Sequence, residues 1–193
     1  MKFSGNIRDV SLLKPDYMGF IFFHGSARFI GEPPFSTFDA IPSSIVKTAV
    51  FVDENVEKII STCRLYGFTA VQLHGSESPD DCLKVQEAGL TVIKAFVVDK
   101  TLPETKVYEN STDFFLFDTS RGTGLKFDWK IIENYDGTTP FFLSGGIGAD
   151  DVEAISKIQH PCFYGIDVNS RFETEPGRKD VTKTANFIKQ IKI

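Results

Sequence analysis

Short apolar runs rich in Val, Ile and Phe recur along the chain, and segments of helical periodicity lie between several of them. Such runs are typical of parallel strands buried on both faces, joined by crossover helices. The pattern predicts strands over 17–23, 46–52, 70–74, 92–97, 113–118, 140–143 and 162–168. It predicts helices over 6–13, 55–66, 79–88, 150–158 and 180–191. No proline- or serine-rich linker divides these elements, so we expect one domain over residues 1–193.

The residues that follow the predicted strands distinguish an open sheet from a closed barrel. A nucleotide-binding open sheet usually carries GxGxxG after its first strand, and this chain has no such motif. Instead, polar residues or glycines follow many different strands, and a barrel gathers all of these strand ends at one mouth. They are His24-Gly25-Ser26, His74-Gly75, Asp118-Thr119, Ser144-Gly145-Gly146 and 167–170. The sequence therefore predicts an α/β fold, a (β/α)8 TIM barrel.

Seven predicted strands are one fewer than a (β/α)8 barrel contains. Only MKFSG precedes the helical segment at 6–13, and no strand is predicted there. We therefore expect the first barrel strand to be missing from this chain. The two strand edges beside such a gap would be prone to association or fraying.

Composition and charge narrow the range of partners. The chain of 193 residues is 41% hydrophobic and 24% charged, close to an average globular domain. Its net charge of −5 leaves no basic surplus for nucleic acid or an anionic membrane, and no apolar run approaches the roughly 20 residues that span a bilayer. Three cysteines without CxxC spacing, Cys63, Cys82 and Cys162, predict free buried thiols and a cytoplasmic location. The oligomeric state is left open.

The segment SGGIGADDVEAI at 144–155 predicts a glycine turn between a buried strand and a helix that begins near Asp150. Glycines let backbone N–H groups approach an anion, and a helix N-terminus favours a phosphate. A second polar loop follows the last predicted strand, and in many barrels the loops after the last two strands share one phosphate. The alternative is that the glycines only form a tight turn. The residues expected to bind a phosphorylated small molecule are Gly145, Gly146, Asp167, Asn169 and Ser170.

Three further side chains are candidates for chemistry. Asp118 ends the strand DFFLFD, where desolvation would raise its pKa and suit it to general acid catalysis, although an aspartate there can also cap a turn. His74 follows AVQL and could be a ligand, a proton carrier or a structural donor. Arg28 could be solvated in its loop or could pair with a carboxylate. The glycine-containing segment at 119–129 is expected to form a flexible cover.

Together these segments resemble the phosphoribosylanthranilate isomerase family, and the resemblance runs along nearly the whole chain. Its motifs are MGFIFFHGSARFI at 18–30, AVFVDEN at 49–55, VQLHGSESPDDC at 71–82, LFDTSRGTGLKFDW at 116–129, LSGGIGADDVEAI at 143–155 and GIDVNSRFETEPGRKD at 165–180. Four positions depart from the family pattern. Ala27 replaces a proline, Arg121 replaces a glycine, and Asn169 and Arg171 depart from a common Ser-Ser-Gly.

The resemblance implies a phosphate-binding barrel that uses no metal or organic cofactor and acts on a small phosphorylated substrate. The reaction would be an Amadori rearrangement of N-(5'-phosphoribosyl)anthranilate to the corresponding 1-deoxyribulose phosphate aminoketose. A general acid protonates the ring oxygen, the furanose opens to an iminium, and a general base removes the C2 proton. The resemblance assigns the acid to Asp118, the contact to the anthranilate carboxylate to Arg28, and phosphate contacts to the region of Gly146 and Ser170.

The family's base is a cysteine in a Lys-x-Cys-Gly element at the end of the first strand. One alignment reads Lys2 to Gly5 as this element and puts Ser4 at the cysteine position, but it deletes part of the following loop, and a serine is a far weaker base. The alignment without a gap makes Met1 the residue after Cys-Gly, and we favour it.

Two alternatives to an active isomerase stay open. One is a catalytically impaired barrel that binds a phosphorylated ligand without turnover. The other is a different phosphate-binding barrel. Indole-glycerol-phosphate synthase is disfavoured because the motif of its catalytic lysines is absent, and ribulose-phosphate epimerase because its metal-binding histidine pattern is absent.

Overall fold

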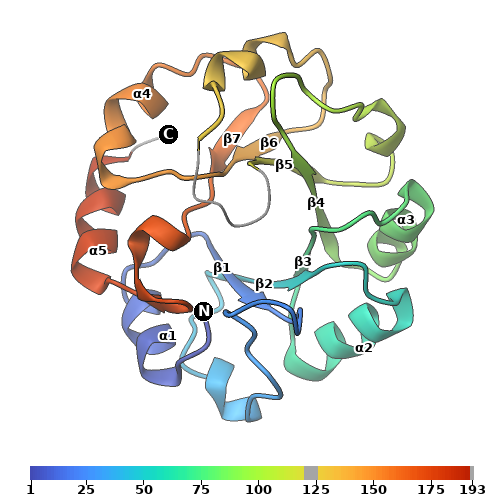
Figure 1. Ribbon diagram of the computed structural model, residues 1–193. Helices are drawn as coiled ribbons and strands as arrows, with labels where there is room; N and C mark the ends of the chain where they lie inside the picture. Colours follow the sequence, from blue (N-terminus) through green and yellow to red (C-terminus); the bar gives the residue numbers. More distant parts are fainter. Residues whose placement is uncertain (120–125, 192–193) are drawn as a thin grey trace.

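The computed structural model describes residues 1–119 and 126–191. Seven strands form one sheet in chain order, and each pairs in parallel with the next along the chain. The strands curl around a common centre and the helices lie outside them (Figure 1). The strands are β1 (Tyr17–Ile21), β2 (Val46–Phe51), β3 (Ala70–Leu73), β4 (Thr91–Val97), β5 (Phe114–Asp118), β6 (Phe141–Leu143) and β7 (Phe163–Ile166).

Local signals in the sequence fix the helices. The side chain of Asn55 accepts a hydrogen bond from Lys58 N at the start of one helix, which ends at Gly67 in the left-handed conformation. Ser78 and Asp81 form a reciprocal capping box at the start of another. The helices are α1 (Ser4–Ser11), α2 (Val56–Tyr66), α3 (Pro79–Glu87), α4 (Val152–Ser156) and α5 (Val181–Gln190).

Short 3₁₀ helices replace α-helices in several crossovers. They are η1 (Phe35–Phe38) after β1, η2 (Lys106–Tyr108) after β4, η3 (Trp129–Asn134) after β5, η4 (Ala149–Asp151) before α4 and η5 (Ser170–Phe172) after β7. The helix expected over 150–158 is therefore shorter than predicted, because the chain first makes the η4 turn. A hairpin of β8 (Glu173–Glu175) and β9 (Arg178–Lys179) was not predicted.

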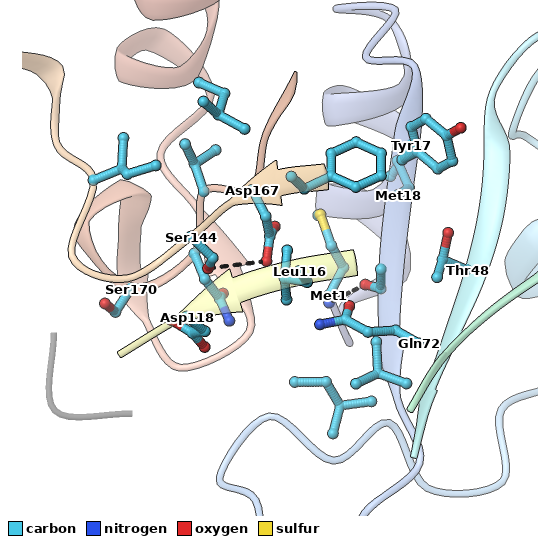
Figure 2. A pocket seen from close by; sticks show the side chains of 18 of the residues that line it. Met1, Tyr17, Met18, Thr48, Gln72, Leu116, Asp118, Ser144, Asp167 and Ser170 are labelled. Carbon is cyan, nitrogen blue, oxygen red and sulfur yellow. Dashed lines mark hydrogen bonds between the residues drawn. The ribbon is translucent and has the colours of Figure 1, made fainter. Parts of the chain in front are cut away.

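β1 and β7 are the two edges of the sheet in the described part of the chain. Met1 lies beside β1, where its N donates to Gly19 O at 2.9 Å, and Lys2 N donates to Gly177 O at 3.2 Å in the hairpin of β8 and β9. The Met1 side chain is buried among apolar side chains and lines the cavity shown in Figure 2. The prediction of seven strands after a leading helix is confirmed.

Apolar side chains pack in three clusters. One lies between the first four strands and helices α1 to α3, and a second lies between the later strands and α4 and α5. A small third cluster is formed by Ile93, Ala95, Leu116 and Phe142, three of which line a cavity. Cys63 and Cys82 are buried in these layers as predicted, whereas Cys162 is only half-buried. Among the described residues, no helix combines the length and apolar character that a membrane crossing requires.

Candidate active site

All eight residues proposed from the sequence line one cavity of about 930 Å³. Because the seven strands are parallel, their carboxyl ends meet at one end of the sheet, and the loops after them bring distant residues together. Figure 2 shows Asp118, Ser144, Asp167 and Ser170 around this space. The residues are Arg28, His74, Asp118, Gly145, Gly146, Asp167, Asn169 and Ser170.

Asp118 is held by two neighbours at the end of β5. Its Oδ1 accepts a hydrogen bond from Thr119 N at 2.8 Å, and its Oδ2 lies 3.3 Å from His74 Nε2. The other ring nitrogen of His74, Nδ1, lies 3.0 Å from Gln72 Nε2. The carboxyl side chain remains 16% exposed, so it is fixed in direction while still open to the cavity.

Asp167 stands opposite Asp118, in the loop after β7. Burial raises its pKa from the ordinary value of 3.8, and the negative charge of Asp118 raises it further. Lys179, His74 and a 3.4 Å hydrogen bond from Ser144 Oγ act in the other direction. Two carboxyl groups thus face one cavity, and the environment of Asp167 favours its protonated form.

Arg28 does not stand free in its loop. Its Nε donates to both carboxylate oxygens of Glu173 at 3.1 and 2.9 Å, and its Nη2 lies 2.8 Å from Glu173 Oε2. Lys179 Nζ lies 3.1 Å from the same carboxylate. Burial alone would raise the pKa of Glu173, but the hydrogen bonds from Arg28 and the charge of Lys179 hold it below its usual range.

Glu173 and Lys179 were missed by sequence reasoning because they belong to the unpredicted hairpin. Both lie within the segment GIDVNSRFETEPGRKD, and that motif was the available signal. Burial lowers the pKa of Lys179, which Glu173 opposes. Its Nζ also donates to the backbone O and Oδ1 of Asn169, at 3.1 and 2.6 Å, so the side chain of Asn169 is directed at Lys179.

The glycine turn after β6 requires glycine. Gly145 and Gly146 have φ angles of 90° and 64°, a region that disfavours side chains. A Cβ on Gly145 would also lie 2.8 Å from Thr119 N, next to Asp118. The positive end of α4 contributes less than expected, because the helix has five residues and the Gly148 N–H already donates to Asp151 Oδ2 at 2.7 Å. The backbone N–H groups of the turn are therefore the stronger candidate for an anion contact.

Three further findings concern the surroundings of the cavity. The cover expected over 119–129 falls mainly on residues 120–125, which lie outside the described residues. None of the three cysteines is among the residues that line the cavity. Within the described ranges, no group of three or more His, Cys, Asp or Glu side chains could hold a metal ion.

Comparison with known proteins finds a matching family model and similar proteins. A family model described as N-(5'-phosphoribosyl)anthranilate (PRA) isomerase matches residues 6–190. An N-(5'-phosphoribosyl)anthranilate isomerase of Parabacteroides distasonis is 44% identical over 194 residues, covering 96% of this chain and 88% of the relative. One of Phocaeicola vulgatus is 39% identical and covers 97% of this chain and 92% of the relative.

Solved structures agree with the fold. The phosphoribosyl anthranilate isomerase of Thermotoga maritima superposes with a TM-score of 0.83 at 30% identity, covering 98% of this chain and 94% of that one. Another, solved in complex with reduced 1-(o-carboxyphenylamino)-1-deoxyribulose 5-phosphate, superposes with a TM-score of 0.81 at 29% identity, with the same coverage. The predicted TIM-barrel architecture is confirmed.

Proposed function

The chain belongs to the N-(5'-phosphoribosyl)anthranilate isomerase family, and we propose that Asp118 is the general acid of the isomerisation from which the family takes its name. The reaction is a step of tryptophan biosynthesis that rearranges an aminoaldose to an aminoketose. It needs one group that gives a proton to the ring oxygen and one that removes the proton from C2. It also needs contacts that hold a carboxylate at one end of the substrate and a phosphate at the other.

One observation carries this assignment: an aspartate at the end of β5, an arginine in the loop after β1 and a glycine turn after β6 line the same cavity. Asp118 is open to the cavity and fixed by Thr119 N and His74. Protonated Asp118 gives its proton to the ring oxygen as the bond from C1 to that oxygen breaks, and the nitrogen lone pair forms the iminium. His74 Nε2 then stabilises the carboxylate that remains.

Residues around the cavity bind the two charged groups of the substrate. Arg28 keeps a guanidinium edge for the anthranilate carboxylate while Glu173 fixes its orientation. The N–H groups of the turn at Gly145 and Gly146, with Ser170 and Asn169 from the loop after β7, surround the phosphate. Asp167, from the same loop, forms a hydrogen bond with a sugar hydroxyl. No cofactor takes part in these contacts.

The second proton transfer needs a base. Cys63 and Cys82 lie in α2 and α3, and burial raises the pKa of each thiol to about 12, so neither supplies a thiolate. The family resemblance assigns the base to the cysteine of a Lys-x-Cys-Gly element at the end of the first barrel strand. Met1 itself lies on the cavity wall, with its backbone N on Gly19 O of β1. A segment joined to Met1 therefore begins at the cavity, beside the edge of the sheet.

The absence of a cysteine from the cavity, in the part of the chain that the structure describes, supports a second candidate function: ligand binding without turnover. Both candidates predict affinity for a phosphorylated ligand, and only isomerase activity predicts product. Calorimetric titration with reduced 1-(o-carboxyphenylamino)-1-deoxyribulose 5-phosphate, paired with a turnover assay on N-(5'-phosphoribosyl)anthranilate, separates them. Binding with product formation supports the isomerase, binding without product supports the second candidate, and no binding contradicts both.

A further inference from the structure

A buried ion pair lies next to the loop that carries His74, and neither partner lines the cavity. Lys94 Nζ lies 3.1 Å from Glu77 Oε2, and the two side chains are 3% and 4% exposed. Burying two charges costs several kcal/mol per ion, and apolar residues of similar volume are often at least as stabilising. Stability alone is therefore a poor explanation for this pair.

The contacts of Lys94 enclose His74 from both sides along the backbone. Its ammonium group lies 3.3 Å from Leu73 O and 2.8 Å from Gly75 O, the carbonyl groups before and after His74. A further contact of 3.1 Å reaches Ala95 O on its own strand. With the Glu77 carboxylate, these acceptors satisfy all three N–H groups of the ammonium.

The carboxylate of Glu77 joins two loops at the mouth. It accepts from Gly75 N at 2.9 and 3.1 Å, and from Asp53 N in the loop after β2 at 2.9 Å. Asp53 has a φ of 51°, an unfavourable value for a residue with a side chain, and its Oδ1 accepts from Ser76 N at 2.5 Å. The loop after β3 is thus tied at successive residues to its neighbours.

These ties determine where the His74 ring points. The His74 backbone N–H is bound to Phe51 O at 2.9 Å, so both peptide groups of the residue are fixed. Gln72 Nε2 lies 3.0 Å from Nδ1 and donates to it, which leaves the ring proton on Nε2, 3.3 Å from Asp118 Oδ2. We propose that Lys94 and Glu77 are positioning residues, which hold the His74 loop so that the Nε2–H of His74 donates to Asp118.

The test uses ¹⁵N NMR of the histidine side chains in the full 193-residue chain, because ring nitrogen shifts report which nitrogen carries the proton. The chain has three histidines, so His24→Gln and His160→Gln variants assign the His74 signals. The test variants are Lys94→Met, which keeps the length of the side chain, and Glu77→Gln, which keeps its shape.

The matched control is Asp113→Asn. Asp113 accepts from Val92 N at 2.8 Å and Gln86 Nε2 at 3.2 Å, and so joins β4 to its neighbours at the opposite end of the same strands. It tests whether a general loosening around β4 is enough to disturb His74.

In the parent protein and in Asp113→Asn, we expect a protonated Nε2 and an unprotonated Nδ1. In Lys94→Met and Glu77→Gln, we expect the two ¹⁵N shifts to converge as both tautomers become populated. If Lys94→Met or Glu77→Gln folds and its His74 ¹⁵N shifts are unchanged, the proposal is overturned. Should neither variant fold, hydrogen exchange in the parent protein decides, because the Gly75 and Asp53 amides must exchange slowly if Glu77 holds them, and fast exchange overturns it.

A kinetic measurement adds the link to catalysis and rests on the proposed function. Misplacement of His74 should lower kcat about a hundredfold in both test variants, with little change in KM, relative to the parent protein and Asp113→Asn assayed alongside. Converged shifts with unchanged kcat would retain the positioning role of Lys94 and Glu77 and contradict the assignment of His74 and Asp118 in the proposed function.

Discussion

Arg28 and Glu173 form a bidentate ion pair between the loop after β1 and the hairpin after β7. The carboxylate is 4% exposed and the guanidinium 21%, so one partner is buried and the other reaches the cavity. This pair joins the loops that follow the two edge strands of the described sheet. An arginine that binds a substrate carboxylate is thereby given a fixed direction before the substrate arrives.

Replacing Glu173 should therefore weaken substrate binding. Glu173→Gln removes the charge that holds Arg28, and hydrogen bonds to charged groups contribute about 1.5–3 kcal/mol. We expect KM for N-(5'-phosphoribosyl)anthranilate to rise roughly tenfold to a hundredfold, with a smaller change in kcat. Steady-state kinetics measure both. Glu175→Gln is the matched control, because Glu175 forms an exposed pair with Arg178 and its replacement should leave KM unchanged. An unchanged KM in Glu173→Gln would contradict the role of Arg28.

A side chain on the glycine turn should weaken phosphate binding. Gly146→Val places a β-branched residue at a φ of 64°, in the turn proposed to bind the phosphate. We expect the Kd of a phosphorylated product analogue, measured by calorimetry, to rise at least tenfold. Gly67 has a φ of 66° at the end of α2, so Gly67→Val imposes the same backbone strain away from the cavity. Equal losses of affinity in the two variants would assign the effect to strain instead of phosphate contacts.

The half-buried carboxyl group of Asp167 should make stability depend on pH. Its pKa is raised in the folded protein, which thus binds this proton more tightly than the unfolded chain does. The resulting stability is fully present below the ordinary pKa of 3.8 and is lost as pH rises through the raised value. The Asp167→Asn variant does not lose stability in this way. The Tm of the variant minus the Tm of the parent should therefore increase as pH rises from 4 towards neutrality. The exposed Asp136, changed to Asn, serves as the reference, and a Tm difference for Asp167→Asn that is constant with pH would contradict the assignment.

The sequence predicted the strands well because each is a compact apolar run followed by a polar residue or glycine. Asp118 and His74 were found for this reason, since each directly follows its run. The caps at Asn55 and Ser78, which the structure shows, are also short-range features of the sequence. Such signals are local, and a single chain is enough to read them.

Relationships between distant segments could not be read in this way. The pair of Arg28 with Glu173 spans 145 positions, and the hairpin that carries Glu173 has only short strands without an apolar alternation. The ion pair of Lys94 and Glu77 could not be predicted, because no sequence pattern identifies the partner of a lysine inside an apolar strand. Only the arrangement of the loops at the mouth brings these charges together.

The turnover of N-(5'-phosphoribosyl)anthranilate by three proteins tests whether Asp118 supplies one proton transfer and a cysteine in an added segment supplies the other. They are the 193-residue chain, the same chain preceded by a strand that ends in Lys-x-Cys-Gly, and that longer chain with Asp118→Asn. A positioned acid or base contributes about 10²–10⁴-fold. We expect the added segment to raise kcat/KM at least a hundredfold. Equal rates with and without it would mean that the base lies elsewhere.

The Asp118→Asn comparison within this assay bears most directly on the proposed function. Asparagine keeps the shape of the side chain and can still meet His74, but it has no proton to give to the ring oxygen. We expect kcat to fall at least a hundredfold, while the Tm and the affinity for the product analogue stay close to those of the parent. A variant that turns over substrate at the parent rate would contradict Asp118 as the general acid.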